Sequence, residues 1–237
     1  MRILALETST EYCSVALWQD GTLNERSELV GQKHSETLLA MLDGVLRDAG
    51  CGMRDIDGIA FGKGPGSFTG VRIACGVTQG LALGADVNVV GVCTLEALAQ
   101  AAGHDKVVAA LDARMGELYL AAYERQVDGW LTVIEPRLCK VEEAPLLVGE
   151  SWFGVGSGFA VNDAALGARY GRQLSGVDAR LVPQAAAVAQ LAAIEFARGH
   201  AVDAALALPL YLRDKVALKT KEREDARSAL ANNGQIK

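Results

Sequence analysis

The chain has 237 residues, is 50% hydrophobic and carries a formal net charge of −6, which suits one large or two small globular domains and argues against a broad nucleic-acid-binding surface. Five scattered cysteines without a Cys-x-x-Cys pair, and a start without a secretory leader, lead us to expect a reduced, cytoplasmic protein. No apolar run approaches the roughly 20 residues needed to span a bilayer, so we expect no membrane partner.

The first hundred residues predict three strands followed by alternating helices and strands. Short strands are expected over 3–6, 12–19 and 22–30, with a polar turn over 7–10 and a hairpin at Asp20-Gly21. Apolar positions at helical spacing predict a helix over 35–49. A buried strand over 58–61, a second helix, a strand over 87–92 and a helix from Thr94 complete the order βββαβαβα.

A glycine-rich turn from Gly62 to Gly70 joins the buried strand to the second helix. It is not a P-loop, because Gly64 rather than Ser or Thr follows Gly62-Lys63, and Ser67 breaks the dinucleotide fingerprint. Two interpretations stay open. The helix start binds an anion, or the turn is an ordinary one in which Ser67 or Thr69 serves as the N-cap.

The second helix also has a nearly bare face, because Gly76, Gly80 and Gly84 recur at every fourth position. A face without side chains permits another helix to approach closely. The usual explanation in a soluble protein is a buried crossing within the same chain, and a contact with another chain is the alternative.

The order of elements then begins again, with strands over 107–111 and 117–124 and a third after Gly129-Trp130. When Leu6-Glu7 is set on Leu111-Asp112, Trp18 falls on Tyr123 without a gap, which indicates an internal duplication. The second half is thinner: it has a glycine-rich segment over 154–158, a helix over 163–170 and an Ala-rich helix over 184–198.

Two βββαβα units with an acid at the end of each first strand are the plan of the actin-like ATPase (ASKHA) superfamily. We therefore expect an α/β fold of two RNase H-like subdomains, the second reduced. The first covers residues 1–102 and the second 103–213, with the helix over 184–198 able to pack back on the first. Residues 214–237 form a charged tail.

Five segments resemble the TsaB (YeaZ) family: Ile3–Ser9, Lys33–Leu39, Gly64–Gly70, Leu111–Glu117 and Leu208–Arg213. The resemblance covers nearly the whole chain and fades in the middle of the second subdomain and in the tail. It implies a non-catalytic scaffold that associates with a TsaD-type catalytic paralogue and a TsaE-type ATPase. Together these proteins place a threonylcarbamoyl group on the adenosine beside the tRNA anticodon.

The resemblance also implies the remaining partners. The chain is expected to form a homodimer when alone and to meet tRNA only through the complex. It requires no cofactor itself, although ATP or ADP can bind at the subunit interface.

The metal site of TsaD-type members is expected to be lost. Those proteins carry Val-Asn-His-x-x-x-His, whereas the matching stretch here runs from Val92 to Leu98, with Thr94 and Leu98 in place of the histidines. Leucine has no lone pair and a threonine hydroxyl is a poor substitute for imidazole. His34, His104 and His200 lack ligand spacing and are expected to be surface or hydrogen-bonded residues, so we assign no metal ligand and no catalytic residue.

A remnant of the nucleotide cleft is a weaker candidate site. Acids at the two strand ends position a metal-nucleotide or a water in active relatives, or they survive as structural acids, and Arg114 pairs with a phosphate or with Glu7 across the cleft. The segment over 154–158 is an adenosine pocket or an ordinary loop. The candidate cleft residues are Glu7, Ser9, Gly64, Gly66, Ser67, Asp112 and Arg114.

The family precedent places the partner interface on the first subdomain's two helices, which would form a four-helix bundle with those of the paralogue. The candidates are Leu38, Leu39, Met41, Leu42, Val45, Val71, Arg72, Ala74, Cys75, Gly76, Gln79, Gly80 and Leu83.

Other functions are a stand-alone actin-like ATP-dependent transferase or kinase, a metallopeptidase-like enzyme, or an independent nucleotide-binding module. The peptidase is weakly supported, because the sequence shows no metal pair and no Ser-His-Asp or Cys-His arrangement.

Overall fold

A computed structural model describes residues 1–213, so the predicted charged tail over 214–237 lies outside the described residues. The first sheet has the order β3-β2-β1-β4-β5. Its strands are β1 (Arg2–Glu7), β2 (Tyr12–Gln19), β3 (Thr22–Leu29), β4 (Gly58–Gly62) and β5 (Asn88–Val92). The central strands β1 and β4 are apolar along almost their whole length because helices cover both faces of the sheet.

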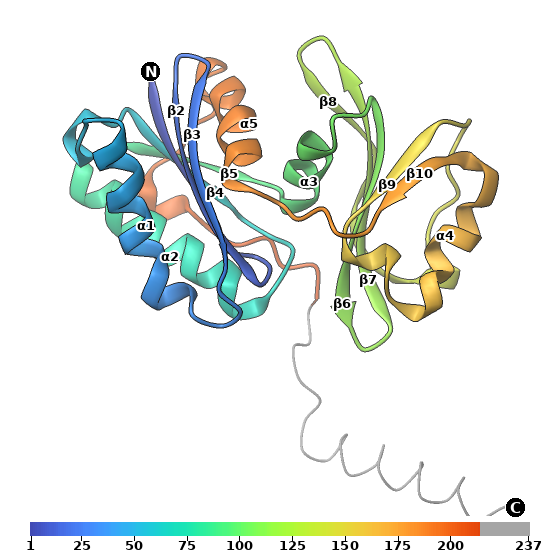
Figure 1. The fold of residues 1–237 in the computed structure, drawn as a ribbon. Helices are drawn as coiled ribbons and strands as arrows, with labels where there is room; N and C mark the ends of the chain where they lie inside the picture. Colours follow the sequence, from blue (N-terminus) through green and yellow to red (C-terminus); the bar gives the residue numbers. More distant parts are fainter. Residues whose placement is uncertain (214–237) are drawn as a thin grey trace, which may run out of the picture.

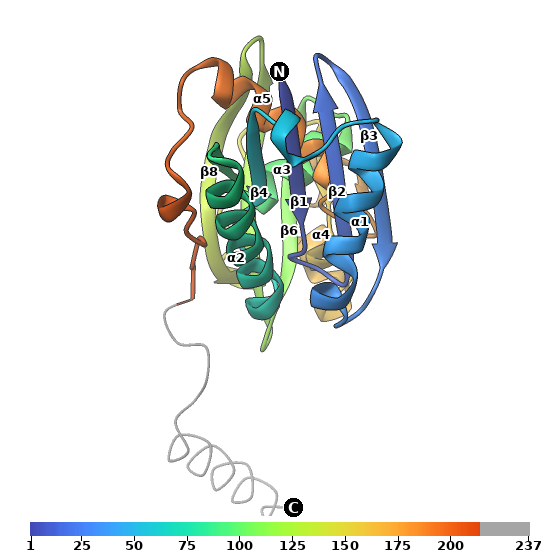
Figure 2. The same ribbon diagram turned by 90° about the vertical axis from the view of Figure 1, so that its left-hand side faces the viewer.

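Three helices cover this sheet (Figures 1 and 2). Helices α1 (His34–Asp48) and α2 (Phe68–Ala85) lie on the outer face, and α5 (Ala185–Ala197) lies on the inner face. Helix α5 contacts β1, β2, β4 and β5, so the Ala-rich segment does pack back on the first sheet. Its alanines sit against Ile3, Ala5 and Ala60, where small side chains let the helix lie close to the strands.

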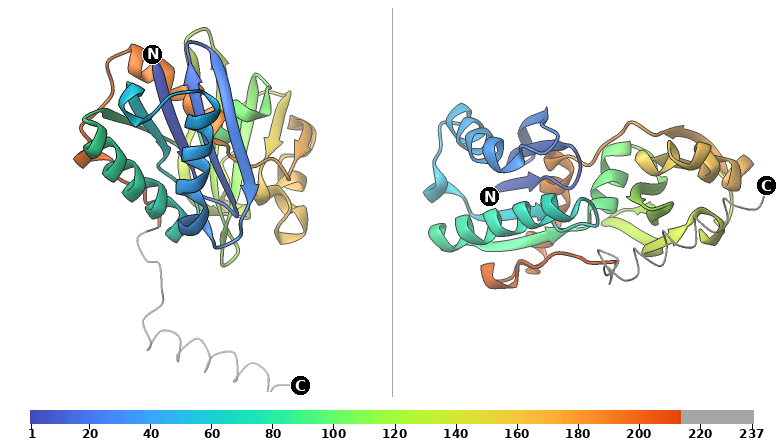
Figure 3. Two further views of the ribbon diagram at one scale, coloured as in Figure 1. Left: turned by 60° about the vertical axis from the view of Figure 1, so that its left-hand side comes forward. Right: turned by 90° about the horizontal axis from the view of Figure 1, so that it is seen from below.

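The second sheet has the order β10-β9-β6-β7-β8, the same connectivity as the first. Its strands are β6 (Lys106–Arg114), β7 (Glu117–Gln126), β8 (Gly129–Lys140), β9 (Trp152–Val155) and β10 (Leu174–Asp178). Helices α3 (Thr94–Ala102) and α5 lie between the two sheets, and α4 (Ala165–Tyr170) covers the far face (Figures 1 and 3). We call the two sheets with their helices the first and second lobes.

The predicted α/β class with two RNase H-like units is confirmed, and the second unit is reduced. Where the first lobe has α1 between its third and fourth strands, the second has only a single 3-10 turn (Val141–Glu143). Strand β10 is not expected from the sequence, because this short parallel strand is mostly exposed and therefore lacks an apolar run.

The ungapped alignment of the two halves is wrong by one residue in the hairpins. Ile3 pairs with Trp18 in the first lobe, whereas Val108 pairs with Ala122 and Tyr123 pairs with Val107 in the second. The register shifts between Asp112 and Arg114, where the second hairpin has an irregularity beside its tight turn. The duplication therefore holds for topology but not residue by residue.

A segment that we call the strap, residues 199–213, follows α5 back to the first lobe and runs beside α2 (Figure 2). Val202 and Val89 exchange backbone hydrogen bonds at 2.8 and 2.9 Å, and a short 3-10 turn (Ala204–Leu206) contacts α2. Further along, the Leu210 amide donates to the Lys63 carbonyl at 2.7 Å. The strap thus links the outer helix to the junction of the lobes.

The glycines before and inside α2 lie in two opposite environments. A Cβ at Gly66 would lie 2.6 Å from the Ser9 Cβ, and a Cβ at Gly70 would overlap the carbonyl of Thr8. The absence of side chains here lets the turn close against the end of β1. By contrast, a Cβ at Gly76, Gly80 or Gly84 would meet no atom within 4 Å in the described part of the chain. The expectation that a helix of the same chain crosses this face is therefore not met by any helix of residues 1–213.

These environments predict opposite effects for one substitution at two glycines of α2. Gly70→Ala should lower the free energy of unfolding by about 1–3 kcal/mol, because backbone atoms of Thr8 must move to admit the methyl group. Gly76→Ala should raise it by roughly 0.5–1 kcal/mol, because the space is open and alanine favours helix. Urea unfolding of both variants tests this, and equal effects would contradict the described packing.

Candidate functional site

Glu7, at the end of β1, is a buried carboxyl and not a cleft residue. Its side chain is 1% exposed, and Oε1 accepts the Ser9 amide at 2.6 Å. Oε2 has no hydrogen-bond partner among the described residues, and neither do the buried hydroxyls of Ser9 and Thr94. Burial raises the pKa of Glu7, and the hydrogen bond from the Ser9 amide only partly offsets this. The geometry favours the structural alternative for this acid.

Several backbone groups of the glycine-rich turn form hydrogen bonds within the chain. The Ser67 amide donates to the Ser9 carbonyl at 2.7 Å, and the Thr8 hydroxyl donates to the Gly70 carbonyl at 2.7 Å. Ser67 is the N-cap of α2, and its Oγ accepts the Gly70 amide at 3.4 Å. The capping interpretation therefore accounts for the turn.

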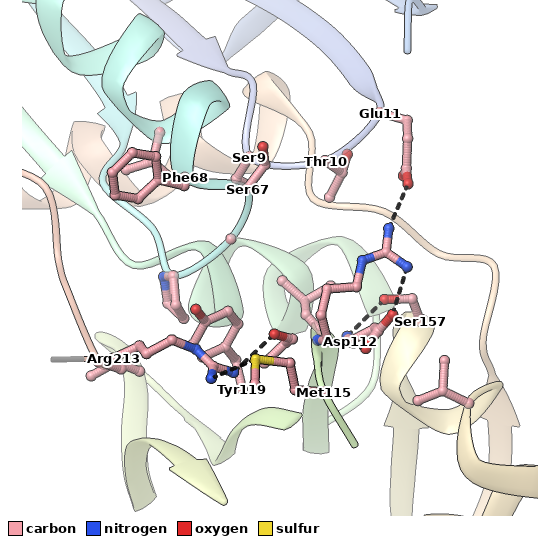
Figure 4. A pocket seen from close by; sticks show the side chains of 18 of the residues that line it. Ser9, Thr10, Glu11, Ser67, Phe68, Asp112, Met115, Tyr119, Ser157 and Arg213 are labelled. Atoms are coloured by element: carbon pink, nitrogen blue, oxygen red, sulfur yellow. Dashed lines mark hydrogen bonds and ion pairs between the residues drawn. The ribbon is translucent and has the colours of Figure 1, made fainter. Parts of the chain in front are cut away.

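A cavity of about 660 Å³ lies between the two lobes (Figure 4). Of the predicted cleft residues it is lined by Ser9, Gly66, Ser67, Asp112 and Arg114, whereas Glu7 and Gly64 do not line it. The sequence analysis did not assign the other polar and aromatic lining residues, because the chain brings them in from the hairpin turn, from β7 and from the strap. They include Glu11, Tyr119, Tyr211 and Arg213, and Ser157 comes from the candidate segment over 154–158.

The charged side chains of the cavity pair with one another (Figure 4). Nη1 of Arg114 lies 3.0 Å from Oδ2 of Asp112, and Nη2 lies 3.8 Å from Oε1 of Glu11 in the other lobe. The expected pairing of Arg114 with Glu7 is wrong, because Glu7 is buried behind the turn and Glu11 is the carboxylate that reaches the cavity. The negative charge of Asp112 is thus partly balanced by the guanidinium of Arg114.

The strap supplies the second arginine of the cavity. Arg213 forms an ion pair with Glu117 at 2.7 Å and donates to the Ala113 carbonyl at 3.0 Å. Within residues 1–213 there is no group of three or more His, Cys, Asp or Glu side chains placed to hold a metal ion. The charged side chains that line the cavity are therefore paired with other groups of the chain.

The positions that would carry the metal histidines lie in the interior. Thr94 and Leu98 are both 0% exposed, at the start and in the middle of α3. The three histidines lie apart: His34 Nε2 is 3.2 Å from the Tyr12 carbonyl, His104 stacks on Phe153, and His200 Nδ1 is 2.8 Å from Glu195.

The glycines over 154–158 serve packing. A Cβ at Gly154 would lie 2.6 Å from the Phe159 ring, and one at Gly158 would lie 2.7 Å from the Ala110 Cβ. The segment is thus a tightly packed loop, and only Ser157 of it faces the cavity, where its hydroxyl accepts the Asp112 amide at 3.0 Å.

The predicted partner interface divides into a buried and an exposed set. The apolar stripe of α1 packs on its own sheet because an amphipathic helix must bury that face, and the inner side of α2 does the same. The buried residues, which cannot contact a partner in this structure, are Leu38, Met41, Leu42, Val45, Val71, Ala74 and Cys75. Assigning them to the interface is therefore wrong for this conformation.

What remains we call the outer face: Leu39, Arg72, Gly76, Gly80 and Leu83. Leu39 of α1 is 56% exposed, and Leu83 of α2 is 79% exposed. The Arg72 guanidinium lies over the Phe68 ring at 3.2 Å from its centroid and over the Tyr211 ring at 4.8 Å. Gln79 is half-buried, and its amide donates to the Ala207 carbonyl of the strap at 3.0 Å.

None of the helices that the structure describes is long and apolar enough to cross a membrane.

Comparison with known proteins places the chain among tRNA-modification proteins. The family model described as TsaD, tRNA N6-adenosine threonylcarbamoyltransferase, matches residues 26–220. The tRNA threonylcarbamoyladenosine biosynthesis protein TsaB of Escherichia coli is 44% identical over 229 residues, which cover 92% of this chain and 97% of that protein. The Haemophilus influenzae protein of the same name is 39% identical, with coverage of 92% and 96%.

Among solved structures, YeaZ from Pseudomonas aeruginosa superimposes with a TM-score of 0.83 at 39% sequence identity. The match covers 89% of this chain and 99% of that chain.

The buried Glu7 predicts a specific pH dependence. A carboxyl whose pKa is raised above its ordinary value of 4.5 binds its proton more tightly in the folded state. Its contribution to stability is therefore lost as the pH rises above about 4.5. Glu7→Gln cannot ionise, so it should unfold at a higher temperature than the wild type at pH 8, and the difference should shrink towards pH 4.5.

Calorimetric unfolding at both pH values checks this. Glu25 and Glu96, whose pKa values burial also raises, are present in both proteins and cancel in the comparison. A variant that is less stable than the wild type at pH 8 would show that the folded protein needs the Glu7 charge.

Proposed function

The chain belongs to the TsaB (YeaZ) family, and on that premise we propose that it is a non-catalytic scaffold and activator of a TsaD-type threonylcarbamoyltransferase. In this proposal the two proteins act with a TsaE-type ATPase to modify the adenosine beside the tRNA anticodon. The observation that carries the proposal is the glycine stripe of α2, which is open to solvent.

The glycine stripe lowers the stability of α2, and no contact within residues 1–213 offsets this. Each glycine in a helix interior lowers stability by roughly 0.5–1 kcal/mol relative to alanine. Gly76 and Gly80 are both exposed, and no described residue packs against the space above them. A helix of another protein can approach the α2 backbone closely at these positions, which would account for the missing side chains.

Leu39 and Leu83 supply the apolar area beside the stripe. Burying an exposed leucine side chain contributes about 1.5–3 kcal/mol, before the cost of association is subtracted. The buried leucines of α1 contribute differently: they hold the helix on its sheet, so the outer face is rigid before the partner arrives. A preformed surface loses less conformational entropy on binding.

The residues in and behind the cleft support a non-catalytic role for this chain. The Asp112 carboxylate is paired with Arg114, Glu7 is buried, and Thr94 and Leu98 stand in the interior at the positions of the metal histidines. We assign no cofactor to this chain, and we propose that any ATP or ADP binds at the junction with the partner. Contact with tRNA is proposed to occur through the complex.

The same outer face offers a route to a homodimer. A surface that accepts helices of a paralogue with the same fold can also accept a second copy of itself in an isologous contact. We propose that such a homodimer forms when the catalytic partner is absent, and that the two assemblies compete for α2.

Gly80 gives the sharpest test of this surface. Gly80→Arg should weaken binding to the TsaD-type partner by at least tenfold, because its side chain fills the space that a partner helix would occupy. Gly80→Ala, the matched control, adds one methyl group and should bind more nearly like the wild type. Titration calorimetry measures both, with circular dichroism and the unfolding temperature as checks on folding.

The fold should tolerate both variants, because the Cβ direction at Gly80 is open. Wild-type affinity in Gly80→Arg would remove the outer face from consideration.

The division of labour is tested separately. The purified chain with Mg²⁺ and ATP should show negligible turnover. When tRNA and threonylcarbamoyl-adenylate as the donor are supplied, threonylcarbamoyl transfer should appear only after the TsaD-type and TsaE-type proteins are added. ATP hydrolysis by the chain alone, abolished by Asp112→Asn, would instead favour the stand-alone enzyme.

A further inference from the structure

The strap leaves large apolar side chains uncovered beside α2. Leu206 is 59% and Leu208 is 62% exposed, and Tyr211 is 49% exposed at the end of the segment. Together with Leu39, Phe68 and Leu83, they give the outer side of the first lobe six of the exposed large apolar side chains of the described residues. Single exposed leucines are common on soluble proteins, but a set on one side marks an interaction surface.

The strap is fixed in place by α2 itself. The Cys75 thiol and the Gln79 amide both donate to the Ala207 carbonyl, at 2.6 and 3.0 Å. Ala204 and Ala207 are buried against the core under α2. Because Ala207 faces inward, its neighbours Leu206 and Leu208 are left facing outward. Cys75 and Gln79, which the sequence predicted to contact a partner, therefore position the strap.

The outer faces of α1 and α2 are small for a stable complex. A specific interface needs about 800 Å² from each side, or roughly 20–30 residues. The exposed positions of the two helices are fewer, and three of them are glycines that bring little area: Ser35, Glu36, Leu39, Ala40, Asp43, Arg47, Asp48, Phe68, Thr69, Arg72, Gly76, Gly80, Leu83 and Gly84. A partner that places a helix on the stripe needs further contact area on this chain. The strap, which lies beside α2, can provide that area (Figure 2).

We propose that the strap is a second wall of the docking surface, and that Leu206 and Leu208 contact the TsaD-type partner. This inference rests on the proposed function, because it takes the occupant of the α2 stripe to be that partner. The glycine stripe then forms the floor of a groove, with Leu39 of α1 on one side and the two strap leucines on the other. Arg72, stacked between Phe68 and Tyr211, joins α2 to the strap at the end of this groove.

The test compares two double variants of the full chain. Leu206→Glu with Leu208→Glu places two carboxylates on the strap, whereas Leu146→Glu with Val148→Glu does the same on the second lobe, where the side chains are 72% and 79% exposed. Binding of each protein to the purified TsaD-type subunit is measured by titration calorimetry, with Gly80→Arg in parallel. Unfolding temperatures show that each variant is folded, and sedimentation measures its self-association.

The strap variant should bind the partner at least tenfold more weakly, and the control should match the wild type. If Gly80→Arg loses binding while the strap variant keeps it, the strap inference fails and the proposed function stands. If both keep wild-type affinity, the proposed docking face fails as well. If the strap variant loses only self-association, the occupant is a second copy, and the inference for the TsaD-type partner is overturned.

Discussion

The close packing of the glycine-rich turn against the end of β1 determines the rest of the first lobe. At Gly66 and Gly70 a side chain would strike Ser9 or the backbone of Thr8, so only a bare turn can close there. Closure fixes Ser67 as the N-cap and therefore the rotation of α2 about its axis. That rotation buries Ala74 and Cys75 and turns Gly76, Gly80 and Gly84 outward. One constraint at the start of the helix thus produces the solvent-facing stripe at its middle.

The same packing explains why the cleft is unlike a nucleotide site. The Ser67 amide, which could face a phosphate, bonds instead to the Ser9 carbonyl, and the Gly70 amide bonds to the Ser67 hydroxyl. Across the cavity, Arg114 joins Asp112 to Glu11, and Arg213 of the strap pairs with Glu117. The charged groups that line the cavity therefore pair with one another, while the helices α3 and α5 pack between the two sheets. Among the described residues, the exposed glycines of α2 have no packing partner.

Sequence reasoning predicted the topology well because hydrophobic period, turns and the repeated strand pattern are local signals. It failed where the burial of a side chain depends on which other elements pack against its helix or strand. From the sequence alone, the leucines of α1 and the glycines of α2 are equally good candidates for an interface. In the structure, however, Leu42 is 4% exposed, whereas Gly80 faces solvent. The role of Cys75 and Gln79 was also out of reach, because their partner, Ala207, lies more than a hundred residues away.

The central claim is that the outer face of the first lobe, and not the cleft, carries the function. The most direct test is threonylcarbamoyl transfer to tRNA by the TsaD-type and TsaE-type proteins with a cleft variant, Asp112→Asn with Arg114→Gln, in place of the wild-type chain. The substitutions remove one charge of each sign and leave α1, α2 and the strap unaltered. If the outer face carries the function, transfer should proceed at the wild-type rate. A loss of transfer by a folded variant that still binds its partner would contradict it.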